Sequence, residues 1–176
     1  SVGDSSHLLA DPENPTQPRA PMPSSPEADA ITAYILAQLA DYPPAASIDL
    51  HEDNLIHEGY VYSQGRLGAT DPLALIAVRA LQDSGIPLKM GGETRFGEPI
   101  FSGIIGPVTD GSIDELMSAE YLVVAGQQVP GPAARTVLVF ETPAARVTLN
   151  KRANAHAALL KQLTRELSSR SPQSDP

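Results

Sequence analysis

One histidine stands where open α/β sheets place their functional groups. The segment Ala46–Leu50 has the composition of a short buried strand, and His51 follows it directly. The carboxyl edge of such a sheet is the usual location of a site, so the imidazole is a candidate metal ligand. Asp49 lies two residues earlier and shares the face of His51, which would allow a supporting hydrogen bond. The alternative is an ordinary histidine at the end of a strand.

A glutamate follows a second apolar run in the same way. Val137–Phe140 are four apolar residues that lead into Glu141, and Thr142 and Pro143 come next. A carboxylate at a strand end either is solvated at the sheet edge or serves a site as a general base. Both readings stay open from this segment alone.

Further short motifs accompany these two residues in a fixed order. Pro23–Ala28 begins a helix before the His51 strand, Gly59-Tyr60-Val61-Tyr62 follows His51-Glu52-Asp53, and Gly111-Ser112-Ile113-Asp114 lies before the Glu141 strand. Over roughly residues 22–165 the combination resembles the zinc carboxypeptidase superfamily, near its succinylglutamate desuccinylase and aspartoacylase branch.

The resemblance implies specific roles. His51 would be the third ligand of a single zinc ion, and Glu141 would be the catalytic glutamate. The reaction would be hydrolysis of a peptide or amide bond next to a free carboxylate, and the substrate a small peptide or an acylated amino acid. The chain has no cysteine, so the remaining zinc ligands must also be His or carboxylate side chains.

The sequence also departs from that family. The family takes its first two ligands from an upstream His-x-x-Glu, whereas His7 is followed by Leu8, Leu9 and Ala10. The Asn-Arg pair that clamps the substrate carboxylate in the family is missing as well. We therefore expect this chain to be the C-terminal half of such a domain and to be inactive by itself. Two alternatives are an N-acyl amino acid amidohydrolase and a non-catalytic α/β binding domain.

Other polar residues are weaker candidates. His57 lies in the loop after the first strand and could line the cleft, although a solvated position is the simpler reading. His156 lies on the apolar stripe of a helix, which favours a partly buried position. Arg66 and Arg95 lie in loops and could contact a substrate carboxylate.

The elements that must position these residues alternate along the chain. Helices begin at the capping residues Ser25, Asp71 and Ser112. We predict helices over 25–41, 71–84, 112–118 and 149–167, and strands over 46–50, 59–63, 100–104, 121–125 and 136–141. This order predicts a three-layer α-β-α domain with a mixed sheet, of the phosphorylase/hydrolase-like type. Residues 1–24 would be an irregular lead-in, 25–167 the catalytic-type domain and 168–176 a mobile tail.

Composition narrows the range of partners. The net charge is −9 and the sequence pI is about 4.7. Since phosphate binding needs a basic face, we expect no nucleic-acid partner. No apolar run approaches the roughly 20 residues of a membrane span, so we expect no membrane partner either.

Overall fold

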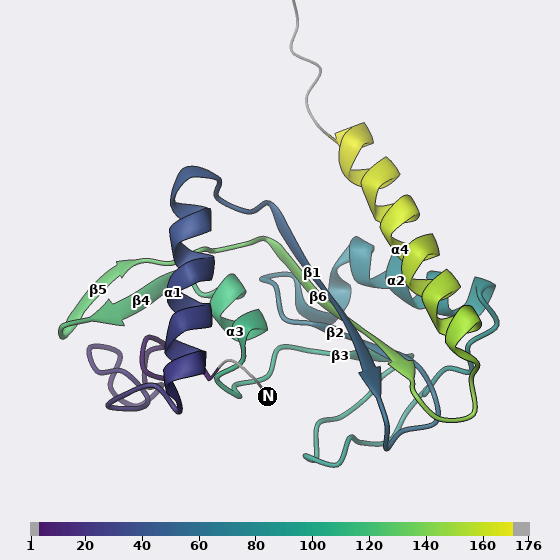
Figure 1. The fold of residues 1–176 in the computed structure, drawn as a ribbon, viewed down its shortest axis with the longest axis horizontal. Helices are drawn as coiled ribbons and strands as arrows, with labels where there is room; N and C mark the ends of the chain where they lie inside the picture. The colour runs from purple at the N-terminus through teal and green to yellow at the C-terminus, as the bar shows by residue number, and fades with distance from the viewer. Residues whose placement is uncertain (1–3, 171–176) are drawn as a thin grey trace, which may run out of the picture. The chain divides into compact units, whose positions relative to one another are not determined.

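The computed structural model describes residues 4–170, which form two compact units. The first unit comprises the residues up to Asp49 together with Gln64–Gly68 and Pro107–Leu138. The second unit comprises Leu50–Ser63, Ala69–Gly106 and the residues from Val139 on. Figure 1 labels the helices and strands that make up these units. Both candidate residues, His51 and Glu141, belong to the second unit.

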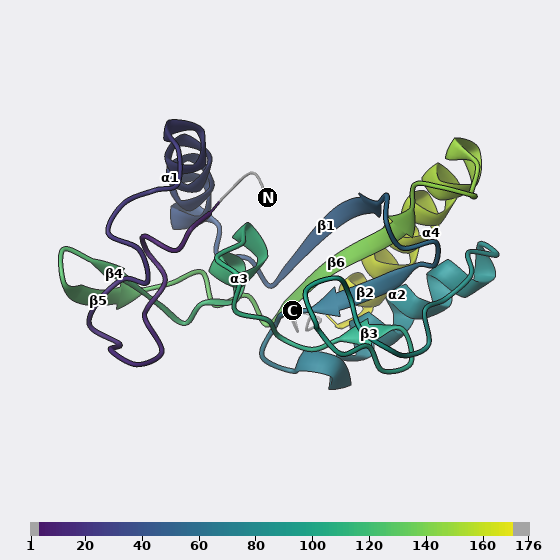
Figure 2. The same cartoon turned by 90° about the horizontal axis from the view of Figure 1, so that it is seen from below.

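Four strands form a mixed sheet in the order β1-β6-β2-β3. They are β1 (Ala46–Asp53), β6 (Thr136–Pro143), β2 (Tyr60–Ser63) and β3 (Ile104–Ile105). The amide of Ala144 donates to the carbonyl of Asp53, and the Thr142 hydroxyl donates to the carbonyl of His51, so β1 and β6 run in the same direction. Strand β2 runs the opposite way to β6, and β3 is parallel to β2 (Figure 2).

Strand β6 is buried along its whole length. This burial fits a strand with a neighbour on either side. Its β-branched and aromatic residues, Val137, Val139 and Phe140, suit a strand covered on both faces. Glu141 is therefore carried on one of the most enclosed segments of the chain.

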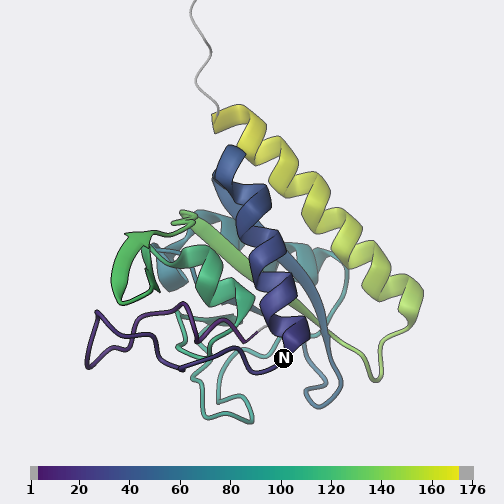
Figure 3. The ribbon, with the colours of Figure 1, turned by 60° about the vertical axis from the view of Figure 1, so that its left-hand side comes forward.

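Two helices pack together in the second unit. Helix α2 (Pro72–Asp83) begins at Asp71, whose side chain accepts a hydrogen bond from the amide of Leu73, and it contacts β2 and α4. Helix α4 (Leu149–Arg170) is one continuous helix (Figure 3). It buries Ala155, Leu159 and Leu163, which recur every four residues and form a single apolar stripe.

Besides the first residues of β1 and β6, the first unit contains two helices and a hairpin. Helix α1 (Pro26–Asp41) begins at the capping residue Ser25, and helix α3 (Ile113–Ser118) begins at Ser112. Strands β4 (Tyr121–Val124) and β5 (Gln127–Pro130) form an antiparallel hairpin. Its two turn residues, Ala125 and Gly126, both have positive φ, as a tight hairpin requires.

The residues before α1 are held by polar contacts within the first unit. The Arg19 guanidinium donates to both oxygens of Glu115, at 2.9 and 2.7 Å. The same carboxylate accepts hydrogen bonds from the amides of Asp110 and Gly111. The pKa of Arg19 is raised mainly by its hydrogen bonds to Glu115. The described part of this segment contains no helix or extended strand, and it is tied to the start of α3.

The predicted α/β class with a mixed sheet and flanking helices is confirmed. The element bounds differ in places: β1 extends to Asp53 rather than Leu50, and β3 is shorter and later than predicted. Strand β5 and the short 3-10 helix Gly68–Thr70 were not predicted. Helix α4 continues to Arg170, and the rest of the predicted tail, 171–176, lies outside the described residues. No helix in the described range has the length and apolarity needed to cross a membrane.

Candidate functional site

His51 and Glu141 lie side by side on neighbouring strands. The Nδ1 atom of His51 is 3.4 Å from the Oε1 atom of Glu141. Each residue is the third from the end of its strand, β1 or β6, and the strands are parallel and adjacent. Equivalent positions on parallel neighbours bring side chains of the same face into contact. The imidazole and the carboxylate therefore meet on one face of the sheet.

The two partners differ in their exposure to solvent. The His51 side chain is 52% exposed, whereas that of Glu141 is only 10% exposed. A deprotonated glutamate with so little contact with water depends on nearby donors or cations for its stability. The imidazole of His51, when protonated, would supply one such partner.

One oxygen of Glu141 stands without a partner. Its Oε2 atom is buried and has no hydrogen-bond donor among the described residues. A buried, unpaired carboxylate oxygen is costly and is uncommon in structural positions. The position suits a group that meets a water molecule, a cation or a ligand during function.

A pocket of about 190 Å³ adjoins Glu141 within the second unit. Its walls come from the end of β1 and the residues that follow it, from Tyr60 and Tyr62 on β2, and from the loop residues Thr94, Arg95 and Phe96. The two tyrosine rings meet edge to face with centroids 5.7 Å apart. The volume equals that of about six water molecules, so the pocket suits a single side chain or a short acyl group.

Asp53 is fixed at the rim of this pocket. Its Oδ1 atom accepts hydrogen bonds from the amides of Leu55 and Ile56, and its Oδ2 atom accepts one from the Tyr60 hydroxyl. Burial alone would raise the pKa of Asp53, but the hydrogen bonds from Tyr60 and the two amides lower it overall. Burial raises the pKa of Tyr60, and its hydrogen bond to Asp53 adds to this rise. Tyr60 is therefore a neutral donor that faces a charged acceptor.

The opposite wall is a short loop attached to β2. The Glu98 carboxylate accepts hydrogen bonds from the hydroxyls of Tyr62 and Thr94, the former at 2.8 Å. Backbone hydrogen bonds close the turn, from the amide of Thr94 to the Glu98 carbonyl and from Gly97 to Thr94. We call residues 93–98 the pocket arm. Its position is set by Glu98, which joins the arm to the sheet.

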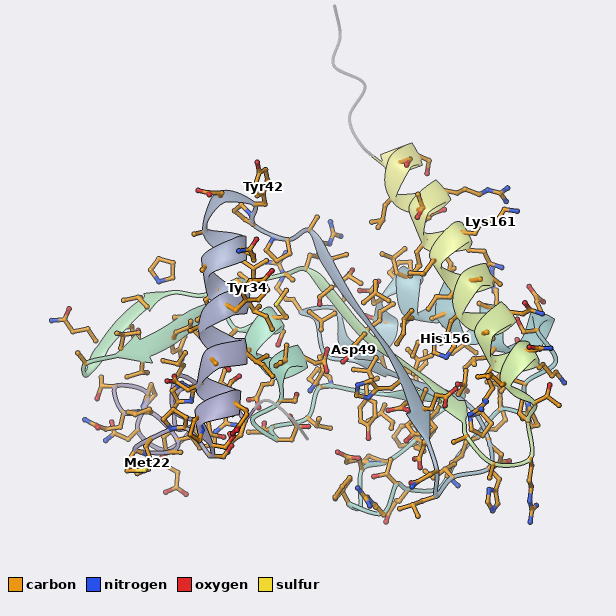
Figure 4. All side chains as sticks on the ribbon, viewed as in Figure 1. Met22, Tyr34, Tyr42, Asp49, His156 and Lys161 are labelled. Atoms are coloured by element: carbon orange, nitrogen blue, oxygen red, sulfur yellow. The ribbon has the colours of Figure 1, made fainter. Side chains whose placement is uncertain are left out.

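Two side chains of helix α4 form hydrogen bonds with residues near the ends of β1 and β6. The Nε2 atom of His156 lies 3.0 Å from the Thr142 hydroxyl, one residue beyond Glu141 (Figure 4 labels His156). The Arg152 guanidinium donates to the Glu52 carboxylate at 2.7 Å, one residue beyond His51. As predicted, His156 is partly buried, with its ring edge to face against Phe140. Neither contact uses a side chain of the His51–Glu141 pair.

The described residues do not by themselves make up a zinc site. Zinc hydrolases hold the metal with three protein ligands, and within the described range no group of three or more His, Cys, Asp or Glu side chains is arranged to bind a metal. His51 could provide one ligand, since its Nδ1 atom faces the enclosed carboxylate. A complete metal site would need donors beyond those that the structure describes.

Of the other candidate residues, only Arg95 lines the pocket beside Glu141. Arg66 lines a separate hollow of about 100 Å³ in the first unit. His57 is exposed and does not line the pocket. His7 belongs to the first unit, where its Nε2 atom lies 3.7 Å from the Oδ1 atom of Asp29.

Sequence reasoning did not anticipate the pocket itself. Tyr60 and Tyr62 belong to a motif of the family resemblance and to a predicted strand, but no pocket was expected from them. The arm residues Thr94, Phe96 and Glu98 lie in a stretch with no regular pattern. An aromatic residue at every second strand position was the one available signal, because side chains two residues apart share a face.

Comparison with known proteins gives structural matches only. No family model and no curated protein sequence matches this chain. Three solved structures of Shewanella proteins, each named "putative metallopeptidase", are similar in fold. The Shewanella baltica chain gives a TM-score of 0.68 at 22% identity, over 93% of this chain and 55% of that one. The Shewanella amazonensis chain gives a TM-score of 0.69 at 20% identity, again over 93% of this chain and 55% of that one.

The third structure, from Shewanella denitrificans, gives a TM-score of 0.64 at 20% identity, over 81% of this chain and 47% of that one. The chain thus has a metallopeptidase-like fold. It spans about half the length of the structures that it matches. At this level of identity the likeness concerns the fold, and activity has to be argued from the site.

Proposed function

We propose that this chain carries part of the active site of a metal-dependent hydrolase, which cleaves a peptide or amide bond next to a free carboxylate in the manner of a zinc carboxypeptidase. The observation that carries the proposal is the 3.4 Å approach of His51 Nδ1 to Glu141 Oε1 at equivalent positions of two parallel strands. The fold likeness to proteins named as metallopeptidases supports the same reading.

In this proposal Glu141 is the general base. Its enclosed carboxylate would take a proton from the attacking water and return it to the amine that leaves. The unpartnered Oε2 atom is the oxygen available for that exchange, because Oε1 faces His51. The enclosed position favours the role, because few other donors compete for this oxygen and a water molecule placed there would be oriented by it.

His51 would provide one metal ligand through Nδ1. A bound zinc ion supplies Lewis acidity, which polarises the scissile carbonyl and acidifies water. The chain's own contribution is the placement of the imidazole within reach of the base. That placement depends on β1 and β6, which the main-chain bond from Ala144 to Asp53 holds together at their ends.

The size of the pocket keeps a second reaction in view. A volume of about 190 Å³ also suits the short acyl group of an N-acyl amino acid, which would make the protein an amidohydrolase. A third possibility is a binding domain that shares the scaffold without metal. The lack of a three-ligand group among the described residues favours this last reading over catalysis by the chain alone.

The test uses the protein expressed from its complete gene. We expect His51→Ala to lower the zinc content, measured by mass spectrometry, while the matched variant His57→Ala leaves it unchanged because His57 is exposed. We expect Glu141→Gln to keep the zinc content and to lower kcat by about 10² to 10⁴-fold on N-acylated dipeptides. Unchanged zinc in His51→Ala, or unchanged turnover in Glu141→Gln, would overturn the proposal.

A further inference from the structure

The end of β1 has a neighbouring strand on one side only. In the described sheet β1 lies at the edge, next to β6, and its residues Leu50, His51 and Glu52 are exposed. Strand β6, by contrast, is buried. The end of an exposed edge strand separates from its neighbour at a lower cost than a buried strand does. The contacts that hold the end of β1 therefore control how closely His51 approaches Glu141.

Two residues of helix α4 contact the ends of these strands. Arg152 donates to Glu52 at 2.7 Å. The Nε2 atom of His156 lies 3.0 Å from the Thr142 hydroxyl. Each of these strand residues directly follows one member of the His51–Glu141 pair. Since successive side chains of a strand point to opposite faces, α4 engages the face of the sheet that the pair does not use.

The spacing of the two helix residues matches the spacing of the strands. Arg152 and His156 are four positions apart, so they lie on one side of α4 and about 6 Å apart along its axis (Figure 4 labels His156). Neighbouring strands of a sheet lie about 4.8 Å apart. One helix residue can therefore reach β1 while the other reaches β6.

Both contacts are partly enclosed. The Arg152 side chain is 12% exposed, and Thr142 is fully buried. The His156 ring packs edge to face against Phe140, with centroids 5.3 Å apart. Burial lowers the pKa of His156, Glu52 raises it and Arg152 lowers it, so the charges of the ion pair act on the neighbouring contact. Losing a partner costs more for enclosed polar groups of this kind than for exposed ones.

We propose that Arg152 and His156 are positioning residues, which hold the end of β1 against β6 and thereby keep the His51 imidazole beside the Glu141 carboxylate. Their action is indirect, because it passes through the strand residue that follows each member of the pair. The inference rests on the proposed function for the use made of the pair, and it deepens that function by assigning the placement of the pair to α4.

The test observes the pair by NMR of the full chain, labelled with ¹⁵N-histidine, at neutral pH and with a chelator present. The chain has four histidines, and His51→Gln identifies the signals of His51. Glu141→Gln replaces the carboxylate that lies 3.4 Å from His51 Nδ1, so it should shift the signal of that nitrogen. We call this shift the pair response. Its measurement needs neither metal nor turnover.

Removal of either α4 contact should weaken the pair response. We expect Arg152→Met and His156→Leu each to lower it by about half or more, because the end of β1 then spends time away from β6. Arg152→Lys and His156→Gln keep a donor at each position and should retain most of the response. Lys161→Met changes an exposed cation of the same helix (Figure 4) and should leave the response unchanged. Unaltered His7 signals would show that the first unit stays folded.

Glu52→Gln tests the ion pair from the strand side. The Glu52 side chain is 40% exposed, so the variant should fold, and its pair response should fall as in Arg152→Met. Combining these two changes should weaken the response no further, because both break one contact. The inference is overturned by a full pair response in Glu52→Gln or in His156→Leu, by no pair response in the wild type, or by an equal loss in Lys161→Met.

The two proposals fail separately. Zinc content and turnover test what the pair does, while the pair response tests only how the pair is placed. A chain that gives the expected responses but never hydrolyses an amide would refute the reaction and retain the positioning role. A metal-dependent hydrolase whose pair response ignores these substitutions would do the reverse.

Discussion

The hydroxyl of Thr142 lies 3.0 Å from Nε2 of His156 and 3.4 Å from the main-chain oxygen of His51. The His51 carbonyl accepts from the threonine, and the roles in the contact with Nε2 depend on which nitrogen of His156 carries the proton. One hydroxyl on β6 therefore joins β1 on one side and α4 on the other, directly beside Glu141.

This arrangement predicts a dependence of stability on pH. Burial lowers the pKa of His156, and Arg152 lowers it further while Glu52 opposes the shift. The unfolded chain therefore binds a proton at His156 more readily than the folded one, and stability is present in full above the ordinary histidine pKa of about 6.5. We expect it to fall as the pH drops below 6.5 toward the lower pKa of the folded state.

The control for that prediction is His156→Gln, whose Nε2 retains a donor for Thr142 but does not titrate. Urea denaturation at pH 7.5 and pH 5 should show a smaller loss of unfolding free energy in the variant than in the wild type. Other groups titrate over the same range. The quantity to compare is therefore the change in unfolding free energy between pH 7.5 and pH 5, in the wild type and in the variant. If that change is the same in both proteins, His156 does not contribute to the pH dependence of stability.

Gly59 is predicted to tolerate no side chain. A Cβ atom there would lie 2.9 Å from a methyl carbon of Ile86 and 3.1 Å from the carbonyl oxygen of Glu141. We expect Gly59→Ala to lower the unfolding free energy by about 1–3 kcal/mol through overpacking. Thermal denaturation measures the loss, and Gly97→Ala is an informative comparison: nothing lies within 4 Å of its Cβ, so any loss there comes from its φ of 79°. A stable Gly59→Ala protein would show that the strands separate at little cost.

Asp71 is predicted to be the more important of two helix caps. It is 1% exposed and accepts from the Leu73 amide, while Ser25 caps α1 with partial exposure. We expect Asp71→Ala to cost about 2 kcal/mol and Ser25→Ala less than 1 kcal/mol, because water can replace the cap only at the more exposed site. Asp71→Asn should recover most of the loss in urea denaturation. Equal costs for the two alanine variants would contradict this ranking.

Glu115 is predicted to be a main source of stability in the first unit. Its carboxylate accepts from Arg19 and from the amides of Asp110 and Gly111, and an amide in its place would turn one acceptor into a donor. We expect Glu115→Gln to cost about 2 kcal/mol, measured by urea denaturation. The exposed Glu120→Gln in the same unit should change the stability by less than 0.5 kcal/mol. A similar effect of both variants would refute the assignment.

Local signals in the sequence predicted most of the fold. The helices α1, α2 and α3 begin beside Ser25, Asp71 and Ser112, where short-range capping sets the start. Strand β5 was missed, since Gln127–Pro130 has no apolar alternation and is a strand only because it pairs with β4. The extension of β1 to Asp53 likewise depends on its partner β6. Pairing of this kind is settled by contacts distant in the sequence.

The candidate site, too, was predicted from the sequence only in part. The family resemblance implied that His51 and Glu141 serve one site, and the Nδ1 atom of His51 lies 3.4 Å from the Oε1 atom of Glu141. The pocket arm could not be foreseen, because its shape depends on a hydrogen bond between Tyr62 and Glu98, 36 positions apart. The hydrogen bond from the Tyr60 hydroxyl to Asp53 was equally inaccessible to pattern reasoning.

The pairing of β1 with β6 has a consequence for how the protein tolerates insertions. Side chains alternate between the faces of a strand, so a shift of one position along either strand would turn the imidazole and the carboxylate to opposite faces. A single residue inserted within Ala46–Leu50 could leave a folded protein in which the two groups never meet. An insertion at the tip of the β4–β5 hairpin, in the other unit, would leave them in register.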